Sequence, residues 1–159
     1  MGRLLRFWAL PRREKHLFCE AGILLLLSHL SIKTIPFRHI DRFLRARWHN
    51  DAREADVVEV IKLADVSLSR VVNLSPWKSL CLSRSMAAFI MLRRRGIPAV
   101  MVAGVMFSED SSLHAHAWID TGHAGPNANS EHSAFTAILR IGQEPVVADS
   151  VSNPPRLAS

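Results

Sequence analysis

Cys81 is the side chain of this sequence that is best placed for covalent chemistry. It lies in the stretch WKSLCLSRSMAAFIMLRRRGIP, residues 77–98, which has the features of a single helix. Ser79 is a suitable N-cap, and Gly96 followed by a proline is a typical helix stop. A thiol in the first turn lies close to unpaired backbone N–H groups and to the positive end of the helix dipole, and both stabilise a thiolate. The position therefore indicates a nucleophile, although most free cysteines are small buried apolar side chains.

A histidine suited to act as the base for this thiol lies downstream in LHAHAWID, residues 113–120. These residues alternate as in a strand, so that His114, His116 and Trp118 share one face. His114 and His116 lie about 6.6 Å apart along such a strand, so only one of them can meet the thiolate. The histidines of this region do not have metal-ligand spacing, and we expect no metal site.

The flanking segments predict an α+β domain in which helices precede a small antiparallel sheet. Apolar residues at helical spacing predict three helices before the cysteine, at about residues 12–31, 36–48 and 51–73. We expect the first of these to be the central, buried helix of the core. Val-rich and alternating segments then predict strands joined by polar turns, at residues 99–107, 113–120 and 135–141, with a helical turn as the alternative for the last of them.

Length and composition indicate one compact domain. The chain has 159 residues, of which 48% are apolar, and this is enough for one core. We expect a single domain over residues 1–159. Its parts are a helical region at about 12–96, a sheet region at about 99–141 and an irregular tail at 142–159.

Charge and cysteine content argue against several classes of function. The formal net charge of +6 suits an acidic partner, but the Trp residues are scattered and do not interleave with a basic stripe, so we expect no nucleic-acid binding. Two cysteines, Cys19 and Cys81, indicate neither a disulfide framework nor a paired-thiol zinc site, and they fit a reducing cytoplasm. The sequence lacks a phosphate-binding loop, so we expect neither a nucleotide nor another cofactor.

An apolar run near the N-terminus, residues 21–27, is similar to part of a signal or membrane segment. It is too short to span a bilayer, carries charges on both sides and has no small-residue cleavage site after it. We interpret it as part of a buried helix and expect no membrane contact. Surface attachment is the alternative, through apolar residues among nearby arginines, namely Leu4, Leu5, Phe7 and Trp8.

Taken together, CLSRSMAAFIMLRRRGIPAVMVAGV and AHAWID resemble the transglutaminase-like cysteine peptidases that remove the leader from lasso-peptide precursors. The resemblance covers about residues 12–141. It rests on a C-x-x-R-S helix start, an R-R-G-I-P helix stop and A-H-A-W on a strand. It implies a transglutaminase/papain-like core and a cysteine peptidase that needs no cofactor. Cys81 would be the nucleophile and His116 its general base.

Two further residues have roles that the resemblance suggests, and both are candidate substrate-binding residues. Arg84 lies one turn after Cys81 and would hold active-site loops or meet a carboxylate of the peptide, with a purely structural arginine as the equal alternative. Trp118 lies two residues beyond His116 on the same strand face. Covering the imidazole ring or packing in the core suits it better than gripping the substrate.

The third catalytic group is where the sequence departs from the family. Related peptidases have an acidic residue about a dozen residues after the histidine, a position that holds Ala128 here. If the strands turn near His123, the residue opposite His116 is near Asn129, whose amide oxygen can accept a bond from an imidazole N–H. Asn129 is therefore our candidate. The alternatives are Asn127, Glu131, Asp149 and Asp120, the last of which lies about 13 Å along the strand from His116.

The resemblance also implies partners. The precursor peptide would be the substrate, a small winged-helix recognition protein would bind its leader, and an ATP-dependent lasso cyclase would close the ring afterwards. The basic segment at residues 38–47 is our candidate docking face, with an ordinary solvated helix face as the alternative. Two other functions stay open: another acyl-transfer enzyme of the transglutaminase superfamily, and a catalytically silent scaffold of the maturation complex.

Overall fold

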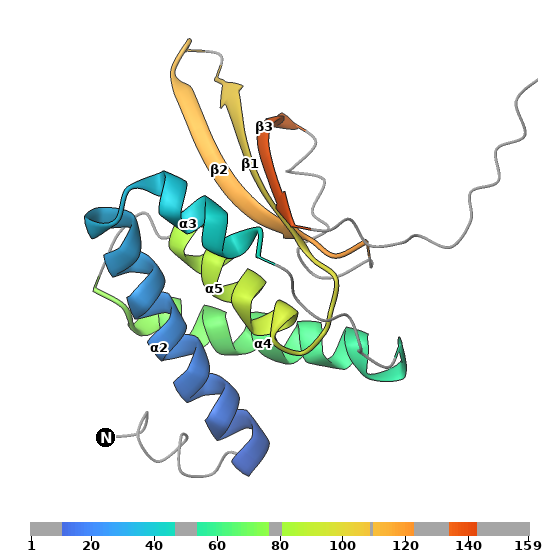
Figure 1. Ribbon diagram of the computed structural model, residues 1–159. Coiled ribbons are helices and arrows are strands. Elements are labelled where there is room, and N and C mark those ends of the chain that lie inside the picture. The colour runs from blue at the N-terminus through green and yellow to red at the C-terminus, as the bar shows by residue number, and fades with distance from the viewer. Residues whose placement is uncertain (1–10, 47–53, 77–80, 109, 123–133, 143–159) are drawn as a thin grey trace, which may run out of the picture.

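The computed structural model describes residues 11–46, 54–76, 81–108, 110–122 and 134–142. Within these ranges a group of helices packs on a small antiparallel sheet (Figure 1). The helices are α2 (Arg12–Thr34), α3 (Phe37–Leu44), α4 (Glu54–Leu74) and α5 (Cys81–Arg93), and the strands are β1 (Val100–Phe107), β2 (Leu113–Asp120) and β3 (Thr136–Gly142). The predicted α+β class, with the cysteine-bearing helix packed on a small antiparallel sheet, is confirmed.

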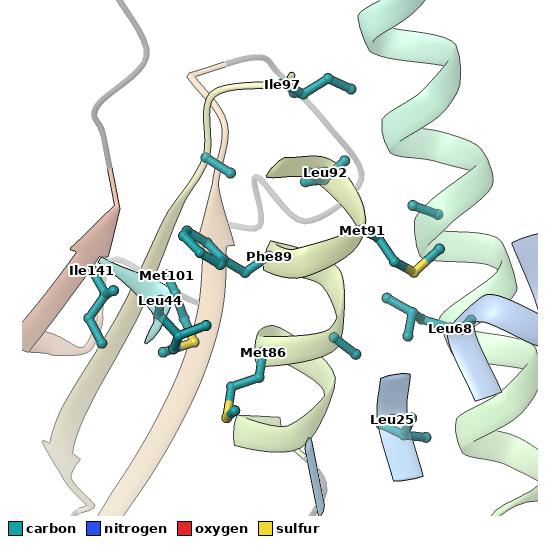
Figure 2. Packing of buried hydrophobic residues seen from close by; sticks show 14 of the residues in the cluster. Leu25, Leu44, Leu68, Met86, Phe89, Met91, Leu92, Ile97, Met101 and Ile141 are labelled. Carbon is teal, nitrogen blue, oxygen red and sulfur yellow. The ribbon is translucent and has the colours of Figure 1, made fainter. Parts of the chain in front are cut away.

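The central helix of the described structure is α5. It contacts α2, α4, β1 and β2, and most of its side chains are buried. Figure 2 shows Phe89 directed toward Met101 and Ile141 of the sheet. On the other side of the helix, Met91 points toward Leu68 of α4 (Figure 2). These fully buried side chains join the helical layer to the sheet, so the position of α5 is fixed from both sides.

The predicted stop of the cysteine helix is confirmed. Gly96 has a φ of 73°, in the left-handed region that favours glycine, and its N–H donates to the carbonyl of Arg93. The N–H of Ile97 donates to the carbonyl of Leu92 at 3.1 Å, which satisfies an acceptor that the helix end would otherwise leave unpaired.

The described sheet has three strands in the order β2-β1-β3, and both pairs are antiparallel. The predicted hairpin is confirmed: β2 spans the expected residues 113–120, and the turn is closed by a bond from the Ser108 N–H to the Ser112 carbonyl. His116 lies opposite Gly104 of β1. On the other side of β1, the register with β3 shifts between Ala103 and Gly104, which marks a β-bulge.

The expectation that the first helix is buried and central is wrong. Its buried side chains form one stripe, made up of Leu17, Ala21, Leu25 and Ser28. Ile23 is 60% exposed and Leu27 is 53% exposed, although both belong to the apolar run. Because this run is apolar on most sides, its sequence does not reveal which side faces the protein. The inner stripe packs on α4 and α5, and the opposite side stays open.

Candidate active site

Cys81 is the first residue of α5 and is half-buried. The expected N-cap, Ser79, lies outside the described residues. The described part of the helix begins at Cys81, and N–H groups at a helix N-terminus that have no partner within the helix can bind a thiolate or an oxyanion. The helix packs on β2, the strand that carries the candidate base. The helix and the histidine strand are therefore in contact, and the side chains of β2 that meet the core shared with α5 are Ala117 and Ile119, which alternate with His116.

His116 is half-buried near the middle of β2. Its ring stacks on Trp118, with centroids 6.1 Å apart and an interplanar angle of 16°, and it also contacts Phe135 at 5.5 Å. Trp118 and Phe135 contact each other at 6.2 Å, so the three rings form one aromatic cluster. On the alternate positions of β2, Ala117 is buried and Ile119 packs against the hydrophobic core. The aromatic cluster thus belongs to the other face of the strand.

Gly104 leaves the space that the indole of Trp118 occupies. A Cβ at this position would lie 2.9 Å from Cη2 of Trp118 and 2.9 Å from the carbonyl oxygen of Thr136, which is too close for any larger residue. The sequence contains a signal for this contact, because a glycine inside the Val- and Met-rich strand VMVAGVMF often marks a close approach. Gly104 therefore helps to fix the ring that covers His116.

Arg84 is bonded to α4 rather than directed into open space. Its Nη2 donates to Oδ1 of Asp65 at 2.7 Å and to Oγ of Ser69 at 2.9 Å. Both side chains of the ion pair are partly buried, with 35% exposure for Arg84 and 19% for Asp65. This geometry favours the structural alternative for Arg84, because its guanidinium joins the first turn of α5 to the middle of α4.

A second polar contact holds the start of α5 to α2. Oγ of Ser83, two residues after Cys81, lies 3.5 Å from Nδ1 of His29. Ser83 is buried and His29 is half-buried. The sequence gives little sign of this contact, since His29 lies 54 positions away within an apolar segment. The first turn of α5 is thus bonded on two sides, to α2 through Ser83 and to α4 through Arg84.

The remaining candidates divide into described and undescribed residues. Asp120 ends β2, where its Oδ1 accepts from the Gly122 N–H at 3.0 Å and its Oδ2 lies 3.4 Å from Arg140. It therefore acts as a turn residue. Nε2 of His114 is bonded to the Ser112 hydroxyl at 2.9 Å on the exposed part of the hairpin. The other candidates for the third group lie outside the described residues, namely Asn129, Asn127, Glu131 and Asp149.

The two thiols of the chain lie in different surroundings. Cys19 is exposed in the middle of α2, whereas Cys81 is half-buried at the start of α5. Within the part of the chain that the structure describes, no group of three or more His, Cys, Asp or Glu side chains could hold a metal ion. The described chemistry is that of a thiol at a helix start and an imidazole enclosed by aromatic rings, which suits acyl transfer.

Comparison with protein-family models gives a match over residues 23–140, to the transglutaminase-like superfamily. Comparison with curated proteins and with solved structures gives no match. The matched region includes α3, α4, α5, β1, β2, the second half of α2 and most of β3, and with them Cys81 and His116. Members of this superfamily are typically cysteine-dependent enzymes that act by acyl transfer or as peptidases. The chain belongs to the transglutaminase-like superfamily.

Proposed function

We propose that this protein is a cysteine peptidase that removes the leader from a ribosomally made lasso-peptide precursor. The observation that carries the proposal is that the described part of α5 begins at Cys81 and that this helix packs on β2, the strand that carries His116. The superfamily supplies the general chemistry of a cysteine acting on a carbonyl. The motifs CLSRS, RRRGIP and AHAW support the specific substrate, because they resemble those of leader peptidases.

In the acylation step, the Cys81 thiolate attacks the carbonyl carbon between leader and core, and a C–S bond forms as the peptide C–N bond breaks. The His116 imidazolium gives its proton to the departing amine, so the core peptide leaves with a free N-terminus. The backbone N–H of Cys81, at the start of α5, helps to hold the oxyanion of the tetrahedral intermediate. The leader stays on Cys81 as a thioester.

In the deacylation step, neutral His116 takes a proton from water as the water oxygen attacks the thioester carbonyl. The leader departs as a carboxylate, and the thiolate and imidazolium are restored. These two reaction steps require Cys81 Sγ and a ring nitrogen of His116 to come within hydrogen-bond reach in the active enzyme. Stacking on Trp118 limits the orientations of the imidazole, and we propose that it selects the productive one.

The experiment that tests this function is incubation of the purified chain with a candidate precursor, with and without a winged-helix leader-recognition protein, followed by mass measurement of the products. We expect leader and core to separate by hydrolysis of one peptide bond, slowly for the chain alone and faster with the recognition protein. Ring closure would need a separate ATP-dependent cyclase. Absence of cleavage under both conditions would contradict the proposal and favour the silent scaffold.

We place the docking face for the recognition protein on α3. Arg38 and Arg42 are exposed on this short helix, whereas Arg45 bonds Asp41 at 2.7 Å and the Arg140 carbonyl at 3.4 Å and so joins α3 to β3. Reversal of the two exposed charges in an Arg38→Glu/Arg42→Glu variant should therefore reduce the stimulation by the recognition protein without unfolding the chain. The matched control is a charge reversal on another helix, Lys62→Glu of α4, which should leave the stimulation intact.

The superfamily itself supports a second candidate, an enzyme that transfers acyl groups from side-chain amides, such as a protein-crosslinking transglutaminase or an amidase. The two enzymes would share the thioester step and differ in the bond that breaks. A glutamine-containing peptide that releases ammonia would indicate the amidase or crosslinking reaction. Cleavage of the precursor backbone would indicate the peptidase.

A further inference from the structure

The outer side of α2 carries a continuous apolar surface. Its members are Ile23, Leu26, Leu27 and Leu30, which are 60%, 40%, 53% and 47% exposed. Their spacing puts them on one side of the helix, opposite the buried inner residues, and Cys19 is exposed one turn earlier. We call these five residues the outer stripe of α2. A run of this length on one helix is larger than the scattered apolar residues that ordinary surfaces carry.

Cationic residues flank the outer stripe at both ends. Arg12 is exposed before it, and Lys33 is exposed after it. The two acidic residues of α2 are engaged elsewhere, because Glu14 bonds Arg70 of α4 and Glu20 bonds arginines after the end of α5. The outer stripe therefore presents an apolar middle with positive ends and no acidic side chain.

The exposed apolar surface continues past the end of α2. Ile35 and Phe37, at the junction with α3, are 42% and 44% exposed. Aromatic and aliphatic side chains beside cations are typical of helices that lie in the boundary between lipid headgroups and acyl chains. The same composition is not expected for a helix side that only faces water.

Three candidate occupants differ in how well they fit this surface. A second copy of the chain would bring cationic ends together in either helix orientation, which is unfavourable. A membrane-spanning position is allowed by the length and composition of α2, but its inner stripe packs on α4 and α5 in the folded protein. An anionic lipid surface satisfies both the apolar middle and the positive ends.

We propose that the outer stripe of α2 binds an anionic phospholipid surface, with the helix lying parallel to the membrane plane. The inner stripe keeps its contacts with α4 and α5, so the fold does not change on binding. Ile23, Leu26, Leu27 and Leu30 enter the outer part of the acyl layer. Arg12 and Lys33 pair with phosphate groups at the two ends of the helix.

The test is co-sedimentation of the full chain with vesicles of equal parts phosphatidylglycerol and phosphatidylcholine, compared with vesicles of phosphatidylcholine alone. We expect binding to the anionic vesicles that weakens with salt and is much lower for the neutral ones. A Leu26→Gln/Leu30→Gln variant should lose about tenfold or more of the partition coefficient. The matched control is Val58→Gln/Val66→Gln on α4, whose side chains are 42% and 43% exposed and should not contribute.

A second measurement does not depend on how the glutamine variant folds. In a Cys81→Ser chain, a small environment-sensitive fluorophore on Cys19 reports directly on the outer stripe, because that thiol is exposed within it. Its emission should shift to the blue with anionic vesicles and stay unchanged with neutral ones. An unshifted fluorophore, equal binding to both kinds of vesicle, or concentration-dependent self-association that buries Cys19 without lipid would overturn the proposal.

Discussion

The two ends of α5 are held by different kinds of contact. At the C-terminal end the backbone closes the helix through Gly96 and Ile97, and Arg95 forms an ion pair with Glu20 of α2. At the N-terminal end the described contacts come from side chains, with Ser83 bonded to His29 and the next residue bonded to α4. One end is a helix stop that the local sequence specifies. The other end, which carries the candidate nucleophile, is held by segments that are distant in the sequence.

The difference suggests that the contacts at the C-terminal end of α5 stabilise the fold, whereas those at the N-terminal end position the thiol for chemistry. Contacts at the C-terminal end involve no group that could react with a substrate, so their loss should affect only the free energy of unfolding. Contacts at the N-terminal end set the direction of the first helical turn and with it the position of Cys81. In an enzyme of this kind, a small displacement of the nucleophile has a large effect on rate.

The largest effect is expected for the nucleophile itself. Cys81→Ala should reduce precursor cleavage by more than about a thousandfold, because no thioester can form. The matched control is Cys19→Ala, which removes an exposed thiol from α2 and should leave cleavage nearly unchanged. Equal losses of cleavage in both variants, measured by product masses, would show that the substitutions impair folding and do not act through the loss of a nucleophile.

The next effect concerns the base. His116→Ala should slow cleavage by about a hundredfold to ten-thousandfold, and it should slow the alkylation of Cys81 by iodoacetamide, because the thiol loses its proposed base. His114→Ala is the control on the same strand, since that ring is bonded to Ser112 at the exposed hairpin end. If Cys81 is alkylated at the same rate in the His116→Ala and His114→Ala variants, Cys81 and His116 do not form a catalytic pair.

A smaller effect is expected for Asn129, the residue that we propose orients the base. Asn129→Ala should lower turnover by about tenfold to a hundredfold without changing precursor binding, because the imidazole would lose the acceptor that fixes its tautomer. Asp120→Ala should do little, since Asp120 bonds Gly122 and Arg140 at the end of β2. The reverse pattern in kcat and in precursor affinity would assign the orienting role to Asp120.

The smallest effect on rate is expected for the ion pairs at the two ends of α5, and a comparison of two variants distinguishes these ends. Arg84→Met and Glu20→Gln each break a partly buried ion pair, and each should cost about 1–2 kcal/mol in the free energy of unfolding. Only Arg84→Met should also slow the alkylation of Cys81, by about severalfold, because it loosens the first turn of α5. Denaturant unfolding and alkylation rates, measured on both variants, test this separation. Similar alkylation rates would mean that Arg84 is structural only.

The sequence predicted those features that depend on local signals. The alternation of LHAHAWID predicted the bounds of β2, and Gly96 with Pro98 predicted the end of the cysteine helix. In each case the deciding interactions lie within a few residues of one another, so the residue types alone carry the information.

The features that the sequence did not predict depend on contacts between distant segments. The side of α2 that faces the protein was not evident, because its apolar run surrounds the helix. The bonds of Arg84 to Asp65 and of Ser83 to His29 join residues 19 and 54 positions apart. The cluster of Phe135 with His116 was missed for the same reason, because it depends on how the sheet is assembled.

The most direct test of the proposed function is to identify the covalent intermediate. The chain is mixed with precursor and recognition protein, quenched in acid within the first turnover, digested and measured by mass spectrometry. We predict that the peptide containing Cys81 gains the mass of the leader less one water, and that hydroxylamine releases the leader as a hydroxamate. An adduct on Cys19, or cleavage that proceeds at an unchanged rate in the Cys81→Ala variant, would contradict the account.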